Sequence, residues 1–101
     1  MKERAEEVLV QAASEFINRE SNRNSMITVT NVETRNRSKH VTVFVSVFPE
    51  KETRAACDFL NRKRNEFREY LKKHTRLHPL PIVTFLPSPV VGGVIEPPEN
   101  I

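Results

Sequence analysis

The sequence has few of the features that define enzymes, membrane proteins and metalloproteins. Its single cysteine, Cys57, excludes an intramolecular disulfide and a cysteine-based metal cluster. No apolar run approaches the roughly 20 residues of a transmembrane helix, and acidic residues interrupt the first ten positions, which is not the pattern of a secretory signal. No nucleophile elbow, phosphate loop or recognisable carboxylate pair is present. We therefore expect a non-enzymatic, cytoplasmic protein that uses no cofactor.

Length and composition indicate one small domain followed by a tail. The chain has 101 residues, of which 38% are hydrophobic and 29% charged, as in ordinary soluble globular proteins. Both glycines and four of the seven prolines lie beyond residue 86. We expect a domain over residues 1–86 and a flexible tail over residues 87–101.

Hydrophobic periodicity predicts the elements of this domain. A helical pattern runs from Lys2 to about Arg19. Alternating, β-branched segments at Met26–Thr34 and His40–Phe48 predict a hairpin, with a bulge near Asn31 where the alternation changes phase. A second helical pattern follows Pro49 and continues to Lys73, and a short strand is expected at Ile82–Leu86. This order predicts an α+β fold with a three-stranded sheet and helices on one face.

The second predicted strand has two different faces. One face consists of valines, which we expect to contact the helices: Val41, Val43, Val45 and Val47. The other face carries Phe44 and Phe48. These rings could form a platform on which nucleic-acid bases stack, but we favour the alternative that helix ends or the tail cover them.

Charge is concentrated between Arg62 and His78. This segment contains seven basic and two acidic residues, a balance of +5 in a chain of net charge +3, so the rest of the chain sums to −2. A slightly acidic body with one strongly basic segment is typical of a protein that binds a polyanion. The alternative is a solvated helix face with intrahelical pairs such as Glu69–Lys73 and Arg62–Glu66, but two acids cannot neutralise seven bases.

The second helical pattern has a charged break in its apolar stripe. The apolar positions fall into two halves: Ala56, Phe59, Leu60, Phe67, Tyr70 and Leu71. Lys63 and Arg64 occupy the positions that would join the halves of a straight helix. Because burying an unpaired charge costs several kcal/mol, we expect the helix to be interrupted between Arg62 and Glu66, with both side chains in solvent.

The order of elements and several segments of the amino-acid sequence resemble the ribosome-binding factor A family, which has the type II KH fold. The resemblance lies in "ERAEEVLVQAASEFINRE", "ITVTNVET", "KHVTVFVSVF", "FLNRKRNEFREYLKK" and "RLHPLPIVTFLPS", and it covers about Lys2 to Ser88. It implies a KH type II-like domain of order α-β-β-α(kinked)-β. It also implies a role in ribosome biogenesis and rRNA processing, with the immature small ribosomal subunit and its 16S rRNA as partners.

Two departures from the family pattern concern the kink. The family interrupts its long helix with Ala-x-Gly. When the segments are aligned on Leu60, Asn61, Phe67 and Arg68, the matching positions here are Arg64, Asn65 and Glu66, and this chain has one residue more than usual between those anchors. KH domains clamp the nucleic-acid backbone with a GXXG loop. The two glycines of this chain, Gly92 and Gly93, both lie in the tail, so the sequence excludes clamping by such a loop.

We expect RNA phosphates to contact the basic residues of the second helical segment and of the hairpin turn. These residues are Arg62, Lys63, Arg64, Arg68, Lys72, Lys73, Arg76, Arg35, Arg37 and Lys39. We expect no metal site at His74 and His78, because Pro79 ends the helix and no acidic partner is near. The leading hypothesis is a monomeric RNA-binding ribosome assembly factor that binds no membrane. The alternative is a protein-interaction or structural domain of the same fold, whose basic segment binds an acidic partner.

Overall fold

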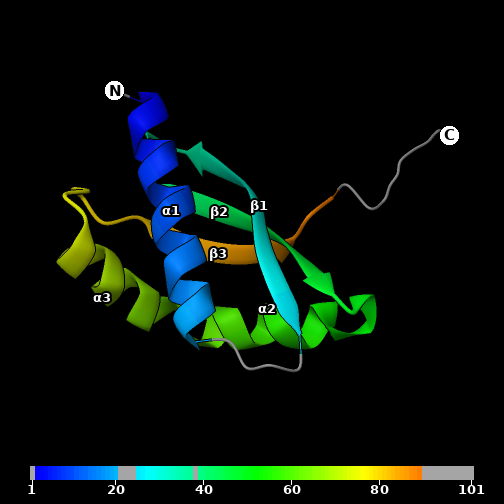
Figure 1. The fold of residues 1–101 in the computed structure, drawn as a ribbon. Coiled ribbons are helices and arrows are strands. Elements are labelled where there is room, and N and C mark those ends of the chain that lie inside the picture. Colours follow the sequence, from blue (N-terminus) through cyan, green and yellow to red (C-terminus); the bar gives the residue numbers. More distant parts are fainter. Residues whose placement is uncertain (1, 21–24, 38, 90–101) are drawn as a thin grey trace, which may run out of the picture.

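The computed structural model describes residues 2–20, 25–37 and 39–89, and it contains the predicted elements in the predicted order (Figure 1). In chain order they are α1 (Lys2–Glu20), β1 (Met26–Arg35), β2 (His40–Phe48), the 3-10 helix η1 (Glu50–Glu52), α2 (Thr53–Arg62), α3 (Arg64–His74) and β3 (Ile82–Pro87). The expected domain boundary at residue 86 therefore falls inside β3, which ends one residue later. The tail prediction falls largely on residues 90–101, which lie outside the described residues.

The three strands form one mixed sheet in the order β1-β2-β3. β1 and β2 pair antiparallel, and their register shifts between Val29 and Asn31, so the bulge predicted near Asn31 is confirmed. β3 joins the sheet parallel to β2, with Val83 opposite Val41. The parallel pairing follows from the helical crossover of α2 and α3, which returns the chain to the end of the sheet where β2 begins.

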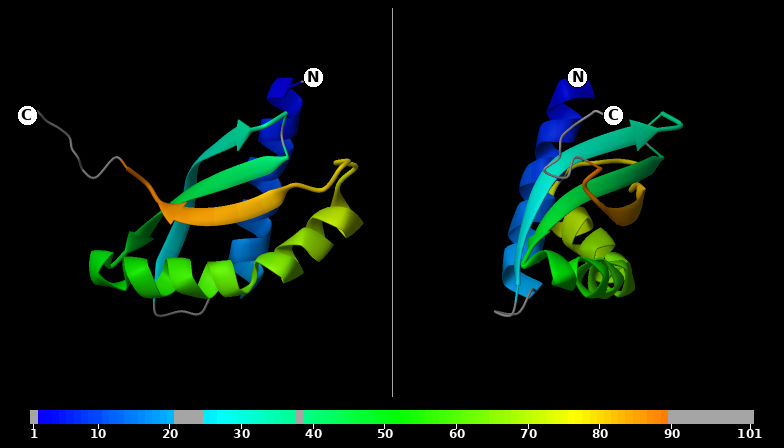
Figure 2. Two further views of the ribbon diagram at one scale, coloured as in Figure 1. Left: turned by 180° about the vertical axis from the view of Figure 1, so that it is seen from behind. Right: turned by 90° about the vertical axis from the view of Figure 1, so that its right-hand side faces the viewer.

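The helices cover one face of the sheet, as the left view of Figure 2 shows from the uncovered side. The four valines of β2 are buried between sheet and helices, and Val43 and Val45 are fully buried, so their predicted orientation is confirmed. Three rings join the layers: Phe16 of α1 lies 5.1 Å from Phe67 of α3, and Phe67 lies 5.7 Å from Phe85 of β3. The core therefore ties both helical segments to the edge strand.

The outer edge of β3 is held by one side chain of α2. Asn61 donates from Nδ2 to the carbonyl of Phe85 at 2.9 Å and accepts from the Phe85 N–H at 2.8 Å. The amide thus satisfies both outward-facing backbone groups of that residue, as a neighbouring strand would. This contact fixes the C-terminal half of β3 against the end of α2.

The other face of the sheet is not covered by any described helix. Phe48 is 74% exposed and Phe44 is half-buried, so the expectation that helix ends cover these rings is wrong. The helix ends lie on the valine side, where α2 and α3 contact β3 and the core. The other expected cover, the tail, lies largely outside the described residues. Within the described part of the chain, no helix is both long and apolar enough to cross a membrane.

Candidate nucleic-acid interface

The predicted interruption of the second helix is confirmed, and it occupies a single residue. α2 ends at Arg62, α3 begins at Arg64, and Lys63 between them has φ −95° and ψ 6°. The Lys63 N–H is shared between the carbonyls of Phe59 at 3.2 Å and Leu60 at 3.0 Å, while its carbonyl accepts from Phe67 at 2.9 Å. This local tightening bends the helix without breaking its hydrogen-bonding path. We call the bend, with Arg62, Lys63 and Arg64, the elbow.

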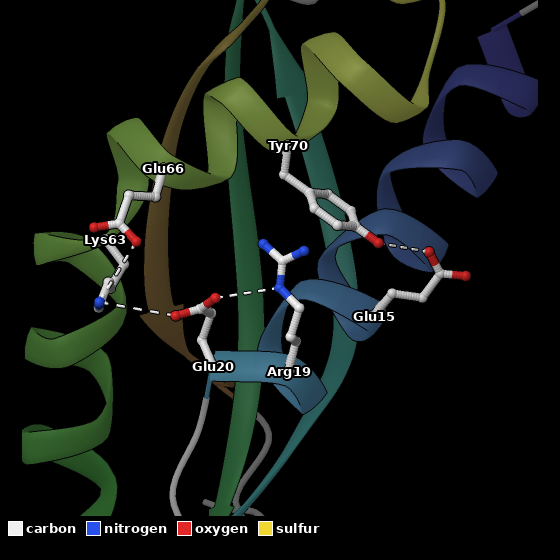
Figure 3. A network of polar contacts seen from close by, with 6 residues as sticks. All are labelled: Glu15, Arg19, Glu20, Lys63, Glu66 and Tyr70. Carbon is white, nitrogen blue, oxygen red and sulfur yellow. Dashed lines mark hydrogen bonds and ion pairs between the residues drawn. The ribbon is translucent and has the colours of Figure 1, made fainter.

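The prediction that both Lys63 and Arg64 are freed to solvent is wrong for Lys63. Arg64 is exposed, but the Lys63 side chain is only 31% exposed. It points toward α1, where Nζ lies 3.8 Å from Glu20 and 3.4 Å from Glu66 (Figure 3). Nζ also lies 5.6 Å from the centre of the Phe59 ring. Lys63 therefore keeps its place in the core-facing stripe, because two carboxylates pair with its charge.

A second set of contacts continues this connection between α1 and α3 (Figure 3). Tyr70 donates its hydroxyl proton to Glu15 at 2.9 Å, and the Arg19 guanidinium lies 4.9 Å from the centre of the Tyr70 ring. Arg19 in turn pairs with Glu20 at 3.2 Å. Burial, followed by the hydrogen bond and the charge of Glu15, raises the pKa of Tyr70 above 10.0, while Arg19 opposes the rise. On the side of α3 that faces α1, Lys63 and Arg19 are thus both paired with carboxylates.

The opposite flank of α3 carries cations at a spacing of four. Arg64, Arg68 and Lys72 are all exposed and recur at i, i+4 and i+8, which places them on one stripe. Tyr70 faces α1 on the other flank, so this stripe lies on the side of α3 away from α1. Among the described residues, none of the three forms an ion pair. We call these three residues, together with Arg62, the basic flank.

The basic flank begins at a shallow polar depression beside β3. The depression has a volume of about 480 Å³ and is lined by Asp58, Asn61, Arg62, Arg64 and Asn65. Asn61 is the residue that holds Phe85, so the depression adjoins the edge strand. Amide side chains and two guanidinium groups are suited to phosphate and polar base edges, whereas Asp58 is the single acidic group.

The remaining predicted residues lie in two other places. Lys73 shares the α1-facing flank with Tyr70 and Glu66, as expected for residues separated by three and four positions. The hairpin-turn residues lie at the end of the sheet where β3 begins, because the Lys39 carbonyl accepts from Ile82 at 2.8 Å. They are joined there by the loop that follows α3, and the residues concerned are Arg35, Arg37, Lys39 and Arg76.

The pairs that would have neutralised the basic segment are not formed as expected. Glu66 pairs with Lys63 rather than Arg62, and among the described residues Glu69 and Lys73 form no ion pair. His74 stacks on Tyr70 with ring centres 4.2 Å apart.

Cys57 is buried, and that burial, with a smaller effect of Asp58, raises the pKa of its thiol above 9.0.

Fold and surface together define a small KH-like α+β domain with an unneutralised basic flank. The model of the family described as ribosome-binding factor A matches residues 1–91, and the chain belongs to that family. No curated protein matches the sequence.

Solved structures of family members have the same fold. The crystal structure of ribosome-binding factor A from Thermus thermophilus is 27% identical and superimposes with a TM-score of 0.76, covering 86% of this chain and 94% of that one. The solution structure of a Thermotoga maritima protein is 20% identical with a TM-score of 0.72 and covers 91% of both chains. A Thermus thermophilus homology model fitted into a cryo-electron microscopy map of a 30S complex is 28% identical, has a TM-score of 0.71 and covers 81% of this chain and 89% of that one.

Sequence reasoning missed two residues that shape the interface. In the sequence Asn61 is only a polar residue near the end of a helical segment, whereas in the structure its bonds to Phe85 place the elbow beside β3. Glu20, the partner of Lys63, lies on another helix. No local pattern could have identified either contact, because both join segments that are distant in the sequence.

Proposed function

We propose that this protein is a non-enzymatic, cytoplasmic assembly factor that binds 16S rRNA in the immature small ribosomal subunit and acts in the processing and maturation of that RNA. The basic flank makes the principal contact. Membership of the ribosome-binding factor A family supports the choice of partner, as does the 30S complex of the Thermus thermophilus relative. Binding is dominated by charge and RNA shape.

The observation that carries the proposal is the separation of paired from unpaired cations around α3. Lys63 and Arg19 are engaged with carboxylates on the side of α1. Arg62, Arg64, Arg68 and Lys72 are exposed and, within the described residues, have no ion-pair partner. Three of these cations lie on one stripe of α3, and Arg62 lines the depression at its start. Each can contact a phosphate and release counterions.

The proposal is tested by sedimenting the tagged protein with cell extract on a gradient. Wild-type protein is expected to migrate with small-subunit particles and to carry nucleic acid, which raises its 260/280 nm absorbance ratio until nuclease is added. The double variant R62Q/R64Q removes two charges at nearly constant helix propensity. Its association should weaken tenfold or more, and its thermal stability should change little because both side chains are exposed.

Lys63→Gln is the matched control for this experiment, because it removes a neighbouring charge that faces α1. It should cost about 0.5–1 kcal/mol of stability through the lost pairs with Glu20 and Glu66, while subunit binding changes by less than threefold. Equal binding by R62Q/R64Q and wild type would place the site elsewhere, with the hairpin end near Lys39 and Arg76 as the next candidate. Association that survives nuclease would favour an acidic protein partner.

A further inference from the structure

The uncovered face of the sheet displays the large apolar side chains that the core leaves out. Among the described residues, four such side chains are exposed, and all lie on this face: Met26 (69%), Phe48 (74%), Ile82 (55%) and Leu86 (43%). Phe44, half-buried, lies between them on β2. Exposed apolar groups gathered on one face of a small protein indicate a binding surface rather than chance exposure.

Strand register arranges these side chains in pairs across the sheet. Met26 is opposite Phe48, and Phe44 is opposite Leu86. The two phenylalanines are four residues apart on one strand, so they are separated by about 13 Å. Between the two pairs lie the hydroxyls of Thr28 and Ser46, which are also opposite each other. Two rings flank a pair of hydrogen-bonding groups on this part of the face.

The edge strand β3 connects this face to the basic flank. Phe85 is bonded to Asn61 in the depression lined by Arg62 and Arg64, and the next residue, Leu86, is on the uncovered face. The left view of Figure 2 shows β3 lying between α2–α3 and the rest of the sheet. A polyanion held by the basic flank would therefore lie beside the Phe44–Leu86 pair, on the strand whose far end carries Phe48.

The charges on the face are compatible with such a ligand. Glu33 and Arg35 lie toward the hairpin turn, near His40, whereas the half that carries Phe44 and Phe48 has no charged side chain among its described β-strand residues. An acidic group there would repel phosphates. An apolar protein segment would need the same rings but would gain nothing from the adjoining row of unpaired cations.

We propose that the uncovered face of the sheet binds unpaired bases of single-stranded RNA, with Phe48 and Phe44 as stacking groups and the basic flank holding the adjoining phosphates. This inference rests on the proposed function and extends it from charge to base contacts. Aromatic stacking accepts any base, so it gives affinity for single strands over duplexes rather than for one sequence. The hydroxyls of Thr28 and Ser46 can bond to base edges between the rings.

The absence of tryptophan from the sequence makes a direct test possible. Phe48→Trp places a single indole on the face, and Gln11→Trp places one at an exposed position of α1 on the opposite side of the sheet. Each full-length variant is titrated with a 12-nucleotide oligoadenylate and with a 12-base-pair RNA duplex. Stacking predicts that the single strand quenches the emission of the Phe48→Trp variant by half or more, and that neither RNA quenches the Gln11→Trp control.

Affinity measurements complete the test. Phe48→Ala should weaken binding of the oligoadenylate at least fivefold while duplex affinity and melting temperature stay unchanged, and Phe48→Tyr should restore the affinity. If the wild type binds duplex and subunits but Phe48→Ala binds the single strand equally well and the indole of Phe48→Trp is not quenched, the stacking inference is wrong and the proposed function stands. If Phe48→Ala loses subunit association but keeps its oligoadenylate affinity, the face binds a protein instead. If the wild type binds neither RNA nor subunits, the proposed function has failed, and the stacking inference fails with it.

Discussion

Lys63 shows how a single residue can satisfy two opposing requirements. Its spacing from Leu60 and Phe67 places it toward the core, and its charge requires water or a partner. The structure resolves this with the carboxylates of Glu20 and Glu66, while the methylene stem stays half-buried. The sequence revealed the conflict but not its resolution, because Glu20 belongs to a different helix.

Tyr70 provides a prediction at the residue scale, since it is the only tyrosine in the chain. Its absorbance near 295 nm should titrate above pH 10, because burial and Glu15 favour the neutral phenol. Glu15→Gln removes the acceptor carboxylate and should lower this pKa, and Arg19→Gln removes the opposing charge and should raise it. A wild-type midpoint at or below 10 would contradict both the burial of the Tyr70 hydroxyl and its bond to Glu15.

The raised pKa of Tyr70 also makes the stability of the fold depend on pH. A phenol whose pKa is higher in the folded state than in the unfolded state contributes stability that is fully present below pH 10.0. That contribution is lost as pH rises from 10.0 through the folded-state pKa. The thiol of Cys57 acts in the same direction from pH 9.0 upward, so the free energy of unfolding should decline above pH 9.

At the scale of elements, periodicity predicted most of the architecture. The alternation of valines in β2 and the phase change near Asn31 are properties of single strands, so they are visible in the sequence. The uncovered state of Phe44 and Phe48 is different. It depends on where the helices end, which the local pattern of β2 does not record.

A prediction at the scale of elements concerns the stability that Asn61 contributes by joining α2 to β3. Asn61→Ala removes two hydrogen bonds to a partly buried backbone and should cost about 1–2 kcal/mol of stability in chemical denaturation. Asn65→Ala, in the same depression but exposed, is the matched control and should stay within about 0.5 kcal/mol of wild type. Equal stability of the two variants would mean that water replaces the Asn61 bonds without loss.

At the scale of the whole molecule, the two flanks of α3 differ in whether their cations are paired. Glu20 of α1 pairs with Lys63 on the near side of the bend, whereas among the described residues the cations of the far flank have no ion-pair partner. The sequence predicted the basic segment but could not divide it, because the division follows from where α1 packs. Of the ten predicted contact residues, our proposal therefore relies on the four of the basic flank.

This sorting predicts the salt dependence of RNA binding. Four phosphate contacts give a slope of about −3 in a plot of log association constant against log salt, so a fourfold rise in salt weakens binding about 60-fold. R62Q/R64Q should reduce the slope by about 1.5, and Lys63→Gln should leave it unchanged. A wild-type slope shallower than about −1 would rule out charge as the main contribution.

The contact between Asn61 and Phe85 also bears on how copies of the chain behave at high concentration. In a parallel strand bonded to β2 through Ile82 and Ser88, the odd-numbered residues of β3 direct their backbone groups outward. Asn61 occupies those of Phe85, and Pro87 has no N–H, which leaves Val83 as the one residue of the strand able to donate outward. A second molecule cannot use one donor as a template for a new strand, so this edge resists fibre growth and domain swapping even though apolar side chains lie beside it.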